Sequence, residues 1–248
     1  MRLAVIADVH SNLEALTVVL EEIRMLGADR IFHLGDIVGY NANPNECIDA
    51  LRADNVDSIS GNHDDACAGR ADISGFKEDA AAAIVYTARE LRPDNLSYLS
   101  GLQEYLRQDG KVPDMLFVHG APSKSSRYIY CRDGALREIP AMDPDIEVCF
   151  FGHTHVPAFY SSTGGLDGRN LQGQPCKVKL DGSGPFFVNP GSVGQPRDGN
   201  PRAAYCVYDT SDRVVYFYRS DYNIDLAKKA IVAAGLPSFN AERLSKGK

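Results

Sequence analysis

Short apolar runs alternate with stretches of helical periodicity over the first 151 residues. Residues 3–7, 31–34, 56–60, 115–118 and 146–151 are apolar runs of strand length, typical of strands buried on both faces of a sheet. Between the first two runs, Leu13, Leu16, Leu20 and Ile23 recur at helical spacing, and Pro44 opens a second helical stretch. The order strand, helix, strand, helix, strand predicts an α/β sheet.

The second part of the chain has a different pattern. Two further helices are predicted before residue 151, at 76–92 and near 93–101, and an amphipathic closing helix is predicted at 223–234. Residues 158–161, 176–180, 186–188, 203–208 and 214–218 are predicted strands joined by Gly- and Asp-rich turns, which implies a second sheet. The polar tail beyond residue 234 is expected to fray. No repeat or linker divides the sequence, so we expect residues 1–248 to form a single domain.

Composition and charge exclude several classes of protein. The 44% hydrophobic and 24% charged residues are ordinary for a globular protein. A net charge of −7 disfavours a broad basic face for nucleic acid or an anionic membrane. No apolar run suits a signal peptide or a membrane span, so a cytoplasmic protein is expected. The six cysteines form no C-x-x-C pair, which indicates reduced thiols rather than disulfides or a zinc cluster.

Metal-ligating residue types follow five of the predicted strands. They are Asp8 and His10, Asp36, Asn62 and His63, His119, and His153 and His155. An open α/β sheet gathers strand ends along one edge, so these side chains can converge. Any one of them is explained by turn geometry. Together, two carboxylates, an amide and several imidazoles without a thiolate suit two divalent ions, such as manganese, iron, zinc, cobalt or nickel.

The order of these motifs resembles the calcineurin-like metallophosphoesterase superfamily. The resemblance rests on Asp8-x-His10, Gly35-Asp36, Gly61-Asn62-His63-Asp64, His119 after Val118, and Gly152-His153-x-His155. It covers the chain from Arg2 to about Tyr218. The turn at 189–192, followed by Gln195-Pro196-Arg197, looks most like the compact bacterial and archaeal phosphoesterases. The resemblance implies a four-layer α-β-β-α sandwich of two mixed β-sheets flanked by helices.

The resemblance also implies a role for each motif residue. Asp36 would bridge two ions, Asp8, His10 and His155 would complete one site, and Asn62, His119 and His153 the other. Such a pair of ions binds a shared hydroxide and orients it for in-line attack on phosphorus. His63 would stay free to hydrogen-bond a phosphoryl oxygen or to protonate the leaving group. Asp64 would either orient His63 or cap the turn.

Three residues are candidates for binding the substrate phosphate: Asn12, Arg127 and Arg197. Each has an alternative role as a helix cap or a surface residue. The remaining histidine, His33, lies inside a predicted strand and is expected to be packed. The protein serine/threonine phosphatases have arginines after Gly-Asp and before Gly-Asn-His, where this chain has Gly39-Tyr40 and Ser60. This difference argues against phosphoprotein substrates.

Three functions are compatible with the sequence. The leading one is metal-dependent hydrolysis of small phosphate diesters or monoesters. The second is hydrolysis of nucleotide polyphosphates of the diadenosine tetraphosphate type, with Tyr40, Tyr128 and Tyr130 available to stack a base. The third is a non-catalytic metal-binding scaffold, although every ligand position and His63 are intact. The sequence does not predict an oligomeric state.

Overall fold

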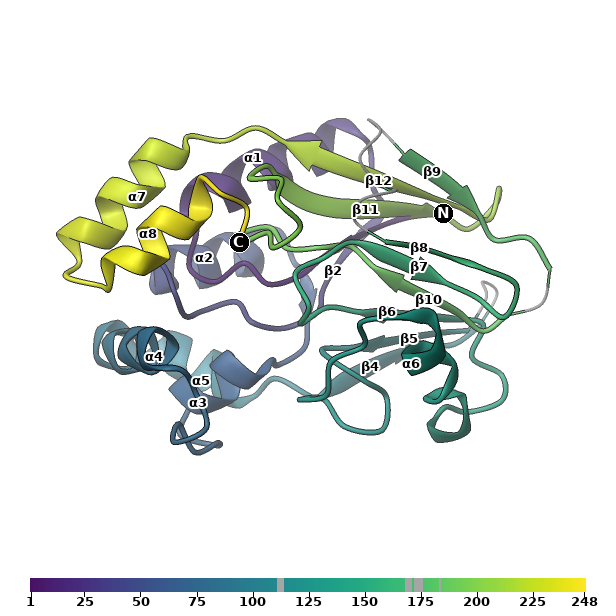
Figure 1. Ribbon diagram of the computed structural model, residues 1–248, viewed down its shortest axis with the longest axis horizontal. Helices are drawn as coiled ribbons and strands as arrows, with labels where there is room; N and C mark the ends of the chain where they lie inside the picture. The colour runs from purple at the N-terminus through teal and green to yellow at the C-terminus, as the bar shows by residue number, and fades with distance from the viewer. Residues whose placement is uncertain (111–113, 168–170, 172–175, 183) are drawn as a thin grey trace.

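A computed structural model describes residues 1–110, 114–167, 171, 176–182 and 184–248 (Figure 1). Within these residues the chain forms two six-stranded mixed sheets that pack face to face, with helices against their outer faces. This arrangement confirms the predicted α-β-β-α sandwich. No helix in the described ranges is long and apolar enough to cross a bilayer.

The first sheet has the strand order β3-β2-β1-β11-β12-β9. Its strands are β1 (Arg2–Ile6), β2 (Arg30–His33), β3 (Asp57–Ser58), β9 (Cys176–Lys179), β11 (Ala203–Asp209) and β12 (Val214–Ser220). The first three strands are parallel, and β11 joins β1 antiparallel. The second sheet, in the order β4-β5-β6-β10-β7-β8, contains β4 (Tyr105–Gln108), β5 (Met115–Val118), β6 (Val148–Phe151), β7 (Ala158–Tyr160), β8 (Gly165–Asp167) and β10 (Phe186–Asn189).

The two sheets do not divide the chain as the sequence pattern implied. The β-rich second part builds no sheet of its own, because each sheet combines three strands from before residue 152 with three from after it. Hydrophobic runs identify strands, but a strand's neighbours are chosen by contacts between segments that are distant along the chain. The late strands therefore complete both sheets.

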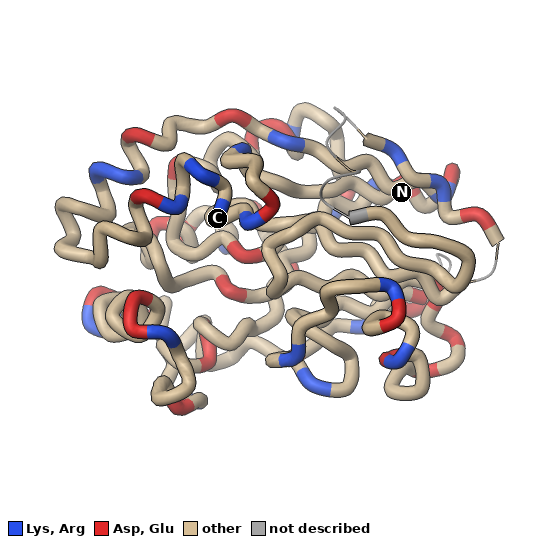
Figure 2. Tube along the Cα trace, viewed as in Figure 1, with Lys and Arg blue, Asp and Glu red and all other residues tan. Residues whose placement is uncertain are grey.

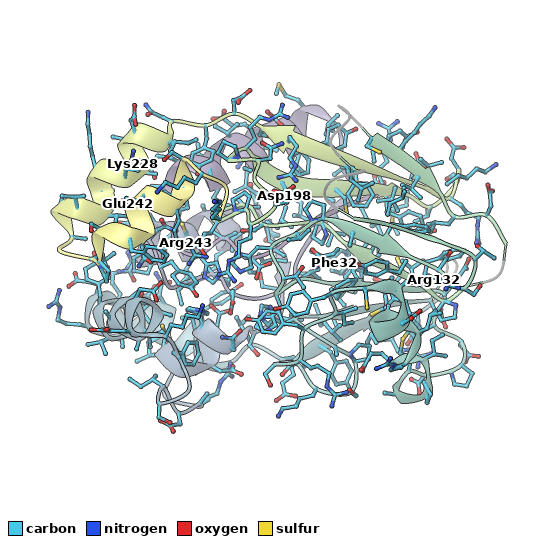
Figure 3. All side chains as sticks on the ribbon, in the orientation of Figure 1. Phe32, Arg132, Asp198, Lys228, Glu242 and Arg243 are labelled. Atoms are coloured by element: carbon cyan, nitrogen blue, oxygen red, sulfur yellow. The ribbon has the colours of Figure 1, made fainter. Side chains whose placement is uncertain are left out.

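Strand β1 shows why the sheets stack. Leu3, Val5 and Ala7 point into the core between the sheets, whereas Ala4 and Ile6 contact helices on the outer face. Across the core, the ring of Phe32 on β2 stacks on that of Phe117 on β5 with centroids 4.0 Å apart (Phe32 is labelled in Figure 3). This continuous apolar run therefore forms a strand whose side chains are buried on both faces of the sheet.

Helices cover both faces and one end of the sandwich. Helices α1 (Leu13–Met25) and α2 (Pro44–Ala53) cover the first sheet. The short α6 (Arg132–Leu136) lies against the second sheet, and η1 (Ile139–Ala141) follows it. At one end of the molecule lie α3 (Asn62–Cys67), α4 (Glu78–Glu90), α5 (Pro93–Ser100), α7 (Ile224–Ala233) and α8 (Ser238–Leu244) (Figure 1).

The expected frayed tail is an ordered helix, α8. Leu244 is 1% exposed and packs with Ile231 of α7, Leu236 and Ala83 of α4. Ser238, Glu242, Ser245 and Lys246 are exposed, which is why composition alone suggested a frayed end, whereas Asn240 is buried. Basic and acidic residues are interspersed along the trace, α8 included (Figure 2). The C-terminal segment is therefore part of the packed domain.

All six cysteines lie in the described residues as free thiols, as predicted. Cys47, Cys67, Cys149 and Cys206 are buried, and Cys131 is exposed.

Candidate metal centre and active site

The structure brings all seven predicted ligands together at one edge of the two sheets. Asp8, His10, Asp36 and His155 form one group and Asp36, His119 and His153 another, and the ligand atoms of each group lie within 4.8 Å of one another. Asn62 joins the second group, with its Oδ1 3.1 Å from Nε2 of His119. Asp36 belongs to both groups, which is the position expected of a bridging carboxylate.

The backbone at these residues is strained. Asp8, His10, Asp36, His153 and His155 have φ angles between 48° and 66°, a region that residues with a side chain seldom adopt. Backbone hydrogen bonds between the loops after β1 and β2 stabilise this conformation: the N–H of Asp8 donates to the carbonyl of Gly35, and that of His10 to the carbonyl of Asp36. Clusters of such residues are a feature of functional sites.

Glycine is required where the metal-binding loops touch. A Cβ atom at Gly61 would lie 2.2 Å from Oδ1 of Asp36, and one at Gly35 would lie 2.6 Å from the backbone nitrogen of Gly61. The Gly-Asp and Gly-Asn-His motifs therefore need their glycines because the two loops pack backbone to backbone.

Backbone carbonyls orient three of the imidazoles. Nδ1 of His10 lies 3.0 Å from the carbonyl oxygen of Val38, Nδ1 of His119 lies 2.8 Å from that of Leu34, and Nδ1 of His155 lies 2.7 Å from that of Gln195. A proton on each Nδ1 satisfies these contacts and leaves Nε2 with a lone pair that faces the site.

Lone pairs of neighbouring ring nitrogens face one another in the site, and bound cations would stabilise them. Nε2 of His10 is 3.1 Å from Nε2 of His155, and Nε2 of His119 is 2.9 Å from Nδ1 of His153. Oδ1 of Asp8 is buried and has no hydrogen-bond partner among the described residues. A buried polar atom without a partner costs about 1–3 kcal/mol. The donor set therefore fits two divalent ions, which would pair with these atoms.

The protonation states of the histidines also support a site for divalent ions. Burial lowers the pKa of His10 and His155 well below 6.5 and that of His153 to about 3, so these rings are neutral and able to bind metal. At His119, burial also favours the neutral ring, but the carboxylates of Asp36 and Asp8 outweigh it and raise the pKa to about 10. The negative charges of Asp36 and Asp8 thus favour a positive charge at this position.

His63 sits beside the ligands without belonging to either group. Its backbone N–H donates to Oδ1 of Asp36 at 2.8 Å, and its ring packs among those of His10, Tyr40 and Phe76. Nδ1 is buried against Gly39, where a Cβ atom would lie only 2.4 Å away. Burial lowers the pKa of His63 to about 4, so the ring is neutral near pH 7.

The Asp64 side chain holds loops together through backbone hydrogen bonds. Its carboxylate accepts hydrogen bonds from the backbone N–H groups of Asp36 at 2.8 Å, Val38 at 3.1 Å and Gly61 at 3.0 Å. No hydrogen bond joins the Asp64 and His63 side chains in the described part of the chain. Of the two roles considered from the sequence, turn capping fits these contacts and orientation of His63 does not.

A pocket with a volume of about 740 Å³ opens over this centre, within the usual range for small-molecule sites. Asn62, His63 and His153 form part of its wall. Among the predicted phosphate binders only Arg197 lines it. The backbone N–H of Arg197 donates to the carbonyl of His155, and its guanidinium donates to Oε1 of Gln195.

The structure places the other two predicted phosphate binders outside the pocket wall. Asn12 is fully buried as the N-cap of α1: it accepts from the N–H of Ala15 and donates to the carbonyl of Gly194. The side chain of Arg127 is 58% exposed, pairs with Glu138 and lies outside the pocket wall. The sequence alone could not distinguish phosphate binding from capping or surface pairing, because the same polar side chains serve all of these roles.

The tyrosines proposed to stack a base differ in what covers their rings. Tyr40 is 8% exposed and is packed against His10 and His63. Tyr128 stacks on His153 with centroids 3.8 Å apart and on Tyr130 at 5.1 Å. Tyr130 is 70% exposed and keeps the most open ring of the three.

Sequence reasoning missed two residues of the pocket wall on α8, Phe239 and Arg243. Pro237 followed by Ser238, with buried Asn240, Ala241 and Leu244 at helical spacing, was the available signal for this helix.

Comparisons with known proteins agree with this site. Residues 1–213 match the calcineurin-like phosphoesterase superfamily domain. Uncharacterized protein MJ0912 from Methanocaldococcus jannaschii is 38% identical over 99% of this chain and 98% of its own length. The crystal structure of a metallophosphoesterase from Sphaerobacter thermophilus is 35% identical, covers 100% of this chain and 99% of that chain, and has a TM-score of 0.85.

A third relative shares the fold at lower identity. Hypothetical protein PH1004 from Pyrococcus horikoshii OT3 is 22% identical and covers 100% of this chain and 98% of that chain, with a TM-score of 0.79. The chain belongs to the calcineurin-like phosphoesterase superfamily, and its buried Asp and His clusters suit a dinuclear metal site.

Proposed function

We propose that the protein hydrolyses small phosphate monoesters or diesters with the help of two bound divalent ions. The observation that carries the proposal is the position of the ligand groups: the side chains that would hold the ions lie beside a pocket of about 740 Å³ and share Asn62 and His153 with its wall. When bound, two such ions activate water as a nucleophile and neutralise charge on the phosphoryl oxygens.

The residues around the ions support phosphate binding. Asp8 and Asp36 are the two anionic groups among the seven ligands, so two divalent ions leave a net positive centre. Arg197 adds a guanidinium to the pocket wall, and guanidinium groups match the geometry of phosphate oxygens. A phosphate ester is therefore attracted to the pocket although the whole chain carries a charge of −7.

His63 is the residue placed to exchange a proton with the substrate. Since Nδ1 is buried against Gly39, the exchange takes place at Nε2. The neutral ring can donate a hydrogen bond to a phosphoryl oxygen, and the ring protonated beside a bound phosphate can give that proton to the departing oxygen and return to the neutral form. Asp64 supports the site by fixing the loop that carries Asp36.

One observation supports a second candidate function, the hydrolysis of a dinucleoside polyphosphate. The stacked rings of Tyr130, Tyr128 and His153 extend from the metal ligands along the pocket, and the Tyr130 ring is exposed. Such a surface suits a nucleobase, as hydrolysis of a dinucleoside polyphosphate would require. Truncation of Tyr130 separates the candidates, because Tyr130→Ala is expected to weaken turnover of a nucleotide substrate and to spare a simple aryl phosphate.

The test is an activity panel on purified protein supplied with manganese. An aryl phosphate monoester, an aryl phosphate diester and a dinucleoside polyphosphate are each assayed with and without a chelator. We expect chelator-sensitive turnover of at least one substrate and a raised KM in Arg197→Ala. Arg127→Ala is the matched control, because it removes an exposed guanidinium outside the pocket. Failure of every substrate in the presence of bound metal would support the non-catalytic scaffold instead.

A further inference from the structure

Two guanidinium groups converge on one ring in the pocket wall. The Cζ atoms of Arg197 and of Arg243 each lie 5.6 Å from the centroid of the Tyr40 ring. The same ring lies 4.6 Å from that of His63 and 4.7 Å from that of His10, measured between centroids. The Tyr40 ring therefore lies next to both guanidinium groups and to two histidines of the candidate site.

The positive charge at this place is only partly compensated. Charged residues of the pocket wall are Lys77, Arg197 and Arg243 against one carboxylate, Asp79. Asp79 lies 3.8 Å from Nη1 of Arg243, whereas Arg197 has no carboxylate within 4.0 Å in the described ranges and binds the neutral amide of Gln195. Burial and the proximity of Arg197 lower the pKa of Arg243, which reflects a cost of holding both cations here.

Arg243 is held toward the pocket by the fold. Its side chain is 15% exposed, its Nε donates to the carbonyl of Lys248, and its guanidinium stacks at 5.4 Å on Phe239 (Arg243 is labelled on α8 in Figure 3). Helix α8 is anchored by buried Leu244. The superfamily match ends at residue 213, so α7 and α8 add these pocket residues from outside the matched domain.

We infer that Arg243, together with Arg197, forms a second anion-binding site in the pocket, and that the substrate carries another phosphate or carboxylate besides the ester that is cleaved. The net charge expected of the metal centre matches one phosphoryl group, and the two arginines offer planar donors for a second anion. The inference rests on the proposed phosphoesterase activity, with Arg243 as a residue that selects the substrate.

The kinetic test uses three substrates with the same ring: phenyl phosphate, 4-carboxyphenyl phosphate and 1,4-phenylene bisphosphate. We expect the wild-type protein to prefer one or both of the last two, and Arg243→Ala to lose kcat/KM on the preferred substrate about 10- to 100-fold more than on phenyl phosphate, the scale of a charged hydrogen bond. Arg243→Lys should keep part of the preference. Lys246→Ala is the matched control, since it removes an exposed cation of the same segment.

A binding measurement keeps the test independent of turnover. Calorimetric titration of the metal-loaded protein with benzene-1,4-diphosphonate and phenylphosphonate should give tighter binding of the diphosphonate, and Arg243→Ala should reduce that advantage by about 10-fold or more. Thermal unfolding establishes that each variant is folded. Equal losses on all ligands, or no wild-type preference for a second anion, would overturn the inference and leave the phosphoesterase proposal intact. Absence of turnover with a retained diphosphonate preference would overturn the proposed function alone.

Discussion

The carboxylate of Asp64 accepts a hydrogen bond from the backbone N–H of Asp36 across 2.8 Å. The same carboxylate binds the N–H of Gly61 at 3.0 Å, so one buried side chain ties the loop after β2 to the start of α3. The shared carboxylate of the candidate metal centre therefore owes its position to a residue that binds no metal.

Asp64→Asn should lower the free energy of unfolding of the metal-free protein by about 2–4 kcal/mol, because an amide cannot accept all of these buried hydrogen bonds. Chemical denaturation measures the change. The control is Asp65→Asn, which alters a half-exposed ion pair with Arg70 and should change stability by about 1 kcal/mol or less. Unchanged stability with a loss of turnover would instead indicate that Asp64 orients His63.

His63→Ala should retain both metal ions and lose turnover about 10²-fold or more, the usual scale for a general acid. Asp36→Asn should instead lose bound metal, because the substitution removes the negative charge that both ligand groups share. Its turnover should fall as a consequence of the lost metal. Elemental analysis of the purified variants measures the metal content. Full activity in His63→Ala would remove this histidine from the mechanism.

Saturation with a divalent ion should stabilise the protein. An ion present at about a thousand times its Kd adds about 4 kcal/mol, which for a chain of this size raises Tm by about 8–16 °C. The stabilisation would arise because the ions pair with the facing lone pairs of His10 and His155 and with Oδ1 of Asp8, which otherwise has no hydrogen-bond partner among the described residues. Thermal unfolding with and without chelator gives the shift, which should persist in His63→Ala and shrink in Asp36→Asn.

Leu244→Ala tests whether the C-terminal helix is part of the core. Leu244 is 1% exposed, and truncation of a buried leucine costs about 2–5 kcal/mol. Leu226→Ala is the matched control on α7, because that leucine is 51% exposed and should be close to neutral. Equal effects in the two variants would show that α8 is loosely held in solution.

A thiol reagent should distinguish the cysteines by burial. Cys131 is exposed and should react rapidly in the native protein. Burial raises the pKa of Cys149 and Cys206, so these thiols stay protonated near pH 8 and should react only when the protein unfolds. Cys131→Ser should reduce the fast phase of an Ellman assay to the contribution of the partly buried Cys176, and fast reaction of more than one thiol in this variant would contradict the assigned burial.

The clustering of the seven candidate ligands was predictable because each motif is local. Asp8-x-His10 follows an apolar run directly, and the carboxyl ends of such strands meet in an α/β sheet. The same logic could not separate Asn12 from Arg197. Both follow strand ends, and only the packing of Gly194 and Ala15 against Asn12 commits its amide to a cap.

Contacts between distant segments account for what the sequence did not predict. Arg243 reaches the pocket because α8 packs on α7 and α4, and nothing near residue 243 in the sequence indicates that neighbour. The division of strands between the sheets was missed for the same reason, since β1 pairs with β11 across some 200 residues of chain.

That pairing also fixes when the first sheet can be completed during biosynthesis. Strand β1 leaves the ribosome early, but its partner β11 includes Asp209 and is made much later. At about 5–20 residues per second, the first strand waits roughly 10–40 s for this neighbour. The first sheet, whose β1 and β2 lead to Asp8 and Asp36, is therefore completed only after Asp209 has been synthesised.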